Sequence, residues 1–111
     1  MRRNVYDGLR TFLERFRANL KVDMEMISQL HKLRNDSEFL FGPEVIEYIR
    51  KWIDHAVNAH VGHEVIEKPV RSSPEDYQGW LQAYNEACQY LAMQFEPLID
   101  IFRPYLAIPL K

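Results

Sequence analysis

The seven residues from Phe39 to Val45 constrain the fold of this chain more than any other stretch. They combine three large apolar side chains with Gly42, a residue type that ends helices, and Pro43, a residue type that begins them. The sequence on both sides has an amphipathic helical pattern, so this stretch joins two helices. We therefore expect a buried hydrophobic joint in which Gly42 takes a left-handed backbone conformation.

Apolar residues recur with a helical period in four segments, at about residues 3–21, 23–41, 43–61 and 74–96. Asp23 stands at the start of the second segment and Ser73 precedes the fourth, and both are residue types that cap helix N-termini. Gly62 follows the third segment and is expected to end that helix. These signals predict a chain of helices joined by short connections, with a longer loop over 62–73.

Pro97 interrupts the end of the fourth segment. A proline cannot donate a backbone hydrogen bond and disfavours helix at the preceding residue, so we expect a kink or break there. A short last turn from Leu98 to Phe102 would follow. No stretch alternates polar and apolar residues for long enough to build a sheet. The sequence predicts an all-α fold, with a single domain over 1–111 that forms a compact, largely antiparallel bundle of four main helices.

Composition excludes several classes of protein. The 111 residues are 47% hydrophobic and carry a net charge of -2, which predicts no strong attraction to nucleic acid. A single cysteine, Cys88, excludes an internal disulfide framework. No secretory leader is visible, and no apolar run approaches the ~18–20 residues needed to span a bilayer. We expect a cytoplasmic location.

Three short motifs follow one another along the chain. They are Arg3-x-Val5-Tyr6, Phe39-Leu40-Phe41-Gly42-Pro43-Glu44-Val45-x-x-Tyr48 and Phe102-Arg103-Pro104-Tyr105-Leu106. Together with a second helix that starts after Asp23, they resemble a family of uncharacterised bacterial proteins. The resemblance implies a small helical cytoplasmic domain that often follows a membrane-spanning segment in other members. It therefore implies membrane association through a segment absent from this chain, and it supplies no catalytic residue.

Histidines are the first candidates for chemistry. His60 and Glu64 would share one face of a continuing helix, with His63 beside them and His55 upstream. Two ring nitrogens and a carboxylate could hold Zn²⁺, so a small metal-binding protein or metal-dependent enzyme is the alternative function. The expected helix end at Gly62 falls inside this set, and the spacing is not that of zinc proteases. Histidines at a polar helix end explain the pattern as well.

Cys88 is the only thiol and a candidate nucleophile. It lies beside the apolar stripe of the fourth segment, where a cysteine usually acts as a small buried hydrophobe with a disfavoured thiolate. We therefore predict no catalytic residue and no cofactor.

A row of arginines on the first helix is the strongest signal outside the expected core. Arg3, Arg10 and Arg17 recur at intervals of seven, so they lie on one side of that helix. This row could pair with acidic neighbours, dock a protein partner or lie on an anionic membrane surface. Nucleic-acid binding is a third, weaker interpretation, since the whole chain is acidic. The sequence favours a non-enzymatic protein-interaction or self-association module, with a protein partner or a homo-oligomer as the assembly.

Overall fold

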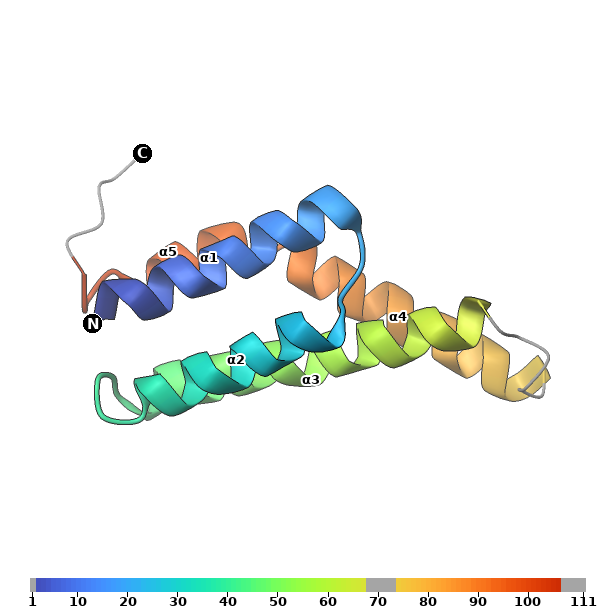
Figure 1. The fold of residues 1–111 in the computed structure, drawn as a ribbon, viewed down its shortest axis with the longest axis horizontal. Coiled ribbons are helices and arrows are strands. Elements are labelled where there is room, and N and C mark those ends of the chain that lie inside the picture. Colours follow the sequence, from blue (N-terminus) through green and yellow to red (C-terminus); the bar gives the residue numbers. More distant parts are fainter. Residues whose placement is uncertain (1, 68–73, 107–111) are drawn as a thin grey trace.

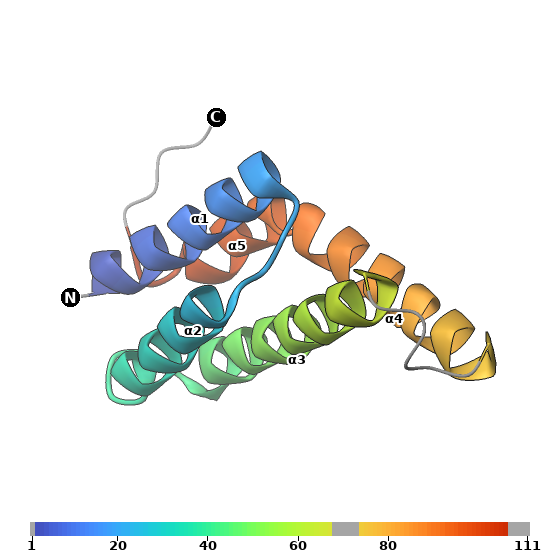
Figure 2. The same ribbon diagram turned by 45° about the vertical axis from the view of Figure 1, so that its right-hand side comes forward.

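The computed structural model describes residues 2–67 and 74–106. These residues form the helices α1 (Arg2–Asn19), α2 (Met24–Ser37), α3 (Pro43–Glu67), α4 (Pro74–Ala92) and α5 (Phe95–Phe102). Helices α1 and α5 lie side by side, α2 lies along α3, and α4 packs against α3 (Figures 1 and 2). The described residues contain no strand, so the all-α prediction is confirmed. None of these helices is long and apolar enough to cross a membrane.

The number of helices differs from the prediction. The expected fourth helix is two helices, because α4 ends at Ala92 and α5 begins at Phe95. The predicted break near Pro97 is therefore confirmed, but it falls at residues 93–94, and the last helix begins at Phe95 rather than at Leu98. The prediction of four main helices is wrong. Pro97 is the third residue of α5, where a missing backbone N–H costs little because the first N–H groups of a helix have no intrahelical partner. The break turns the chain from α3 toward α1 (Figure 2).

A buried glutamine stabilises this break. The Tyr48 hydroxyl of α3 donates to Gln94 Oε1 at 2.8 Å, and Gln94 Nε2 donates to the Tyr90 carbonyl at 2.9 Å. Most buried polar groups in proteins are hydrogen-bonded, and these contacts satisfy Tyr48 and Gln94 in this way. Desolvation also raises the pKa of Tyr48, so its hydroxyl stays a neutral donor. The contact ties the α4–α5 junction to α3.

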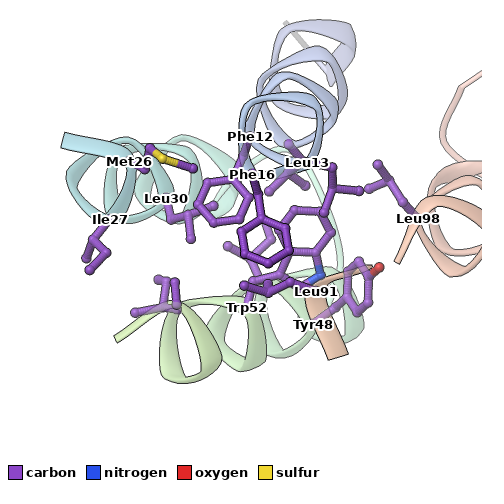
Figure 3. Close-up of a cluster of buried hydrophobic side chains, with 14 of the residues drawn as sticks. Phe12, Leu13, Phe16, Met26, Ile27, Leu30, Tyr48, Trp52, Leu91 and Leu98 are labelled. Atoms are coloured by element: carbon purple, nitrogen blue, oxygen red, sulfur yellow. The ribbon is translucent and has the colours of Figure 1, made fainter. Parts of the chain in front are cut away.

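The core lies between the helix pairs and is built from large side chains (Figure 3). Trp52 of α3 is completely buried, and its ring centroid lies 5.8 Å from that of Phe12 of α1. Leu30 of α2, Leu91 of α4 and Leu98 of α5 are also buried, so every helix contributes to one cluster. The stripes that the sequence predicts include Phe12, Leu30, Trp52 and Leu91, and Leu98 lies in the predicted short last turn.

The third helix is longer than predicted. It continues through Gly62 to Glu67, and Gly62 is buried rather than placed at a helix end. A Cβ atom at Gly62 would lie 2.7 Å from the Tyr84 Cβ of α4, which is closer than such atoms can approach. Gly62 therefore serves the contact between α3 and α4, and its predicted role as a stop signal is wrong. The predicted cap at Ser73 lies outside the described residues.

The N-terminal cap of α2 is confirmed. Asp23 has an extended backbone, and its Oδ1 accepts a hydrogen bond of 2.8 Å from the Met26 N–H. This bond satisfies one of the N–H groups that a helix start leaves free, which typically contributes about 1 kcal/mol. Asp23 therefore fixes where the chain re-enters a helix after α1.

Leu20 at the end of α1 is in a strained conformation. Its φ is 52°, the only positive φ of the described non-glycine residues, and its side chain is 66% exposed. Leu20 ends the apolar stripe of the first segment, so the burial that this stripe predicts for it is wrong. A left-handed conformation costs an L-residue roughly 1–2 kcal/mol, and glycine avoids most of this cost.

We expect Leu20→Gly to raise the free energy of unfolding by about 1 kcal/mol, because glycine relieves the strain at this helix end. Urea denaturation followed by tryptophan fluorescence measures the change. Leu20→Ala is the control, because it removes the exposed side chain but keeps the strain. An equal gain in both variants would show that the leucine side chain, rather than its backbone conformation, carries the cost.

The Phe39–Val45 joint is only partly buried. Phe41 is buried at 9% exposure and Leu40 is half-buried, but Phe39 is 93% exposed. Glycines with positive φ are absent from the described residues, so the expected left-handed conformation of Gly42 is also wrong. Phe41 N–H and Leu40 N–H both donate to the Ser37 carbonyl, at 3.2 and 3.1 Å, which forms the turn without that conformation.

Candidate functional site

A hollow beside Phe39 lies between α1 and the end of α2. Its cavity volume is about 410 Å³. The lining residues are Asn4, Val5, Leu33, Asn35, Asp36, Phe39 and Leu40. Apolar side chains occur together with two amides and one carboxylate, the mixture that protein-binding surfaces show.

A second hollow continues along the same two helices. Its cavity volume is about 270 Å³, and it is lined by Gly8, Thr11, Phe12, Arg15, Met26, Gln29 and Leu33. Leu33 lines both hollows and lies against Gly8, where an added Cβ would be 2.7 Å from Leu33 Cδ2. We call the two hollows together the α1–α2 groove, with Leu33 as a low ridge across its middle.

The groove carries opposite charges at its two ends. Asp36 lines the hollow beside Phe39, and Arg15 lines the hollow farther along α1. Asp36 is exposed and Arg15 is half-buried. A ligand that lies along the groove would therefore meet a carboxylate at one end and a guanidinium at the other.

Phe39 is exposed because the turn after α2 directs neighbouring aromatics to opposite sides. The Phe41 ring packs edge-on against Phe102 and Tyr105, with centroid distances of 5.0 and 5.1 Å. Phe39 makes no ring contact among the described residues and keeps 93% of its surface exposed. Burying a phenylalanine contributes roughly 1.5–3 kcal/mol, so the free chain leaves this contribution unused.

Both ends of the described chain hold this turn in place. The Tyr105 hydroxyl accepts from the Gly42 N–H at 3.3 Å and donates to Glu44. From the other end, Arg2 Nε donates to the Leu40 carbonyl at 2.9 Å. The Arg2 guanidinium also lies 5.9 Å from the centroid of the Phe41 ring and 5.4 Å from that of Tyr105. The centroid of the Tyr6 ring also lies 5.7 Å from that of the Phe102 ring. The three motifs of the sequence therefore meet at one end of the molecule, and they position Phe39 next to the groove.

The arginine row does not line the groove, and one of its members contacts α5. The Arg17 guanidinium is 5.7 Å from the Phe95 ring centroid of α5. Arg3 Nε lies 3.3 Å from Asp7 Oδ1, and its guanidinium is 5.9 Å from the Tyr6 ring. Arg10 is exposed. Two of the three predicted partner-binding residues thus have contacts within the chain, and a role for the row in docking stays a prediction.

The histidines do not form the metal site of the alternative prediction. His60 Nδ1 lies 2.9 Å from the Val22 carbonyl, which makes that nitrogen a donor and removes it as a ligand. His60 Nε2 is 3.6 Å from Glu64, whereas His63 Nε2 is 2.8 Å from a different carboxylate, Glu67. In the part of the chain that the structure describes, no group of three or more His, Cys, Asp or Glu side chains could hold a metal. Because α3 continues past Gly62, these residues act as pairs along one helix.

The remaining titratable groups are in packed positions. His55 stacks on Tyr90 with a centroid distance of 3.9 Å, and burial lowers its pKa below the usual value. Cys88 is half-buried, and desolvation raises the pKa of its thiol. A raised thiol pKa disfavours the reactive thiolate, as expected for a cysteine that packs rather than reacts.

Sequence reasoning missed Phe39, although a signal for it exists. The buried stripe of α2 passes through Leu30 and Leu33 to the buried Ser37 and then Phe41. At 100° per residue, Phe39 lies on the opposite side of that stripe. Extending the helical period of α2 to residues 39–41 would have predicted that Phe41 is buried and Phe39 is exposed.

The resemblance to a bacterial protein family stays a prediction. No protein-family model matches this chain, and neither the comparison with curated proteins nor the comparison with solved structures finds a match.

Proposed function

We propose that this chain is a non-enzymatic protein-interaction module that docks a protein through the α1–α2 groove and Phe39. The observation that carries the proposal is the 93% exposure of Phe39 beside a hollow lined by Val5, Leu33 and Leu40. A phenylalanine held outside a core is a typical anchor of a protein interface, where it supplies binding free energy by leaving water.

The rim of the groove supports a protein ligand rather than a small apolar one. Asn4 and Asn35 offer amide donors and acceptors, and Asp36 offers a carboxylate. Protein interfaces combine an apolar centre with such a polar rim. The turn that carries Phe39 is held by Arg2 and Tyr105, so the anchor is presented with little loss of backbone freedom on binding.

Site-specific photo-crosslinking in the cells that produce the chain tests this proposal. Phe39 is replaced by p-benzoylphenylalanine, which retains the aromatic ring and reacts with whatever covers it. We expect a discrete covalent adduct with a protein, either another copy of the chain or a different one. The control places the same residue at Gln78, an exposed position on α4. Equal labelling at both positions, or none at position 39, would refute the proposal.

A further inference from the structure

We propose that the occupant of the α1–α2 groove is a second copy of this chain, related to the first by a two-fold axis. This inference rests on the proposed function, because it names the partner that the same surface binds. In the dimer, Phe39 of each copy enters the groove of the other. The groove has three properties that bear on a second copy as its occupant, which are its self-complementary shape, the order of its charges and its size.

The shape is self-complementary because the protruding group and the hollow belong to one patch. A two-fold interface uses the same patch on both subunits, so that patch must contain both a protrusion and its receptor. Phe39 protrudes at the end of the groove, and Leu33 and Val5 line the hollow beside it. A two-fold axis near Leu33 places each Phe39 over the second hollow of the other copy, which Phe12 and Met26 line.

A two-fold axis allows two face-to-face grooves to lie either parallel or antiparallel, and the order of the charges selects the antiparallel arrangement. Asp36 lies at the Phe39 end of the groove and Arg15 at the other end. When two grooves lie face to face and antiparallel, Asp36 of each copy meets Arg15 of the other. A parallel arrangement would instead oppose like charges, which is unfavourable.

The size of the patch predicts a weak dimer. The α1 part of the groove extends from Asn4 to Arg15, which is roughly 16 Å at 1.5 Å per residue. Standard interfaces use about 20–30 residues a side, more than line these two hollows. We therefore expect a dissociation constant on the order of 0.1 mM, so the chain exchanges between monomer and dimer.

Sedimentation equilibrium of the purified chain tests the dimer. Between ~10 µM and ~500 µM, we expect the average mass to rise from the monomer value of 13.3 kDa toward twice that value. Phe39→Ser should weaken the association by at least ~tenfold, since it removes the central anchor. Circular dichroism checks that this variant keeps its helices, which the exposure of Phe39 leads us to expect.

A charge exchange makes the test specific for the antiparallel two-fold arrangement. Asp36→Arg and Arg15→Asp should each dimerise less than the wild-type chain, because each opposes like charges at both ends of the interface. A mixture of the two variants should dimerise again. In the mixed dimer one chain carries arginine at both positions and the other carries aspartate at both, so opposite charges meet at each end. Dimers that are unaffected by either variant would overturn the proposal.

The two proposals fail in different ways. A chain that stays monomeric at all concentrations but crosslinks through position 39 to a different protein overturns the dimer and leaves the docking surface intact. A chain that stays monomeric and forms no adduct at position 39 removes both.

Discussion

Phe102→Ala should lower the free energy of unfolding by about 3–5 kcal/mol, whereas Phe39→Ala should change it by less than about 0.5 kcal/mol. Both variants remove the same ring, so the difference reports burial alone. Phe102 is completely buried, and its ring centroid lies 5.7 Å from that of Tyr6 and 5.0 Å from that of Phe41. Removing it leaves a cavity where α5 meets α1 and the α2–α3 turn.

Urea denaturation followed by the fluorescence of the two tryptophans measures both changes. A small domain has about 5–15 kcal/mol of stability, so a loss of this size brings Phe102→Ala close to unfolding even without denaturant. Phe102→Leu is the milder variant, and it should lose less than Phe102→Ala because the cavity is smaller. Equal losses from Phe102→Ala and Phe39→Ala would contradict the burial that the structure shows.

Phe102→Ala and Phe39→Ala also distinguish residues that stabilise the Phe39–Val45 joint from the residue proposed to bind the partner. Phe41 and Phe102 hold the end of the molecule together, and Phe39 is presented by that packing. Phe102→Ala should therefore reduce binding together with stability, because it loosens the packing that presents Phe39. Phe39→Ala should reduce binding in a chain that remains folded.

The helices were predictable because their signals are local. The cap at Asp23 and the break near Pro97 follow from the hydrogen-bonding capacity of single residues, and both are confirmed. The apolar stripes also identified Trp52 and Phe12 as core residues. A pattern repeated every 3.6 residues reports which side of a helix is buried, whatever that side packs against.

The groove was not predictable, because it depends on how two helices pair. Its hollows lie on both sides of Leu33, which rests on Gly8 of α1. The sequence shows that Gly8 lies inside a helix, but it does not show which side chain occupies the space that glycine leaves. The charge order from Asp36 to Arg15 has the same origin, since these residues share a groove only after α1 and α2 pack.

Gly62, near the C-terminal end of α3, is a second case in which helix packing decides the role of a residue. A glycine near the end of an apolar stripe is typical of a helix stop, and this position was predicted as one. The helix instead continues to Glu67, because α4 approaches so closely that only glycine fits opposite Tyr84. A local signal cannot separate these two roles, since the second is set by a partner helix elsewhere in the chain.

Gly62→Ala should therefore lower the free energy of unfolding by about 1–3 kcal/mol, although alanine is the better helix former. The added methyl would lie 2.7 Å from Tyr84 Cβ and 3.4 Å from the Trp80 carbonyl oxygen. A Cβ atom cannot move without its backbone, so relief requires α3 and α4 to separate. These two helices form the most extensive helix contact among the described residues, and Gly62→Ala should disturb it along much of its length.

Gly79→Ala is the matched control, because Gly79 lies in α4 with no atom within 4 Å of an added Cβ. There only helix propensity acts, so this variant should gain up to about 1 kcal/mol. Urea denaturation of the two variants beside the wild-type chain measures the opposite signs. A stabilising effect of Gly62→Ala would contradict the close approach of Tyr84 to Gly62 and, with it, the role of this glycine in the contact between α3 and α4.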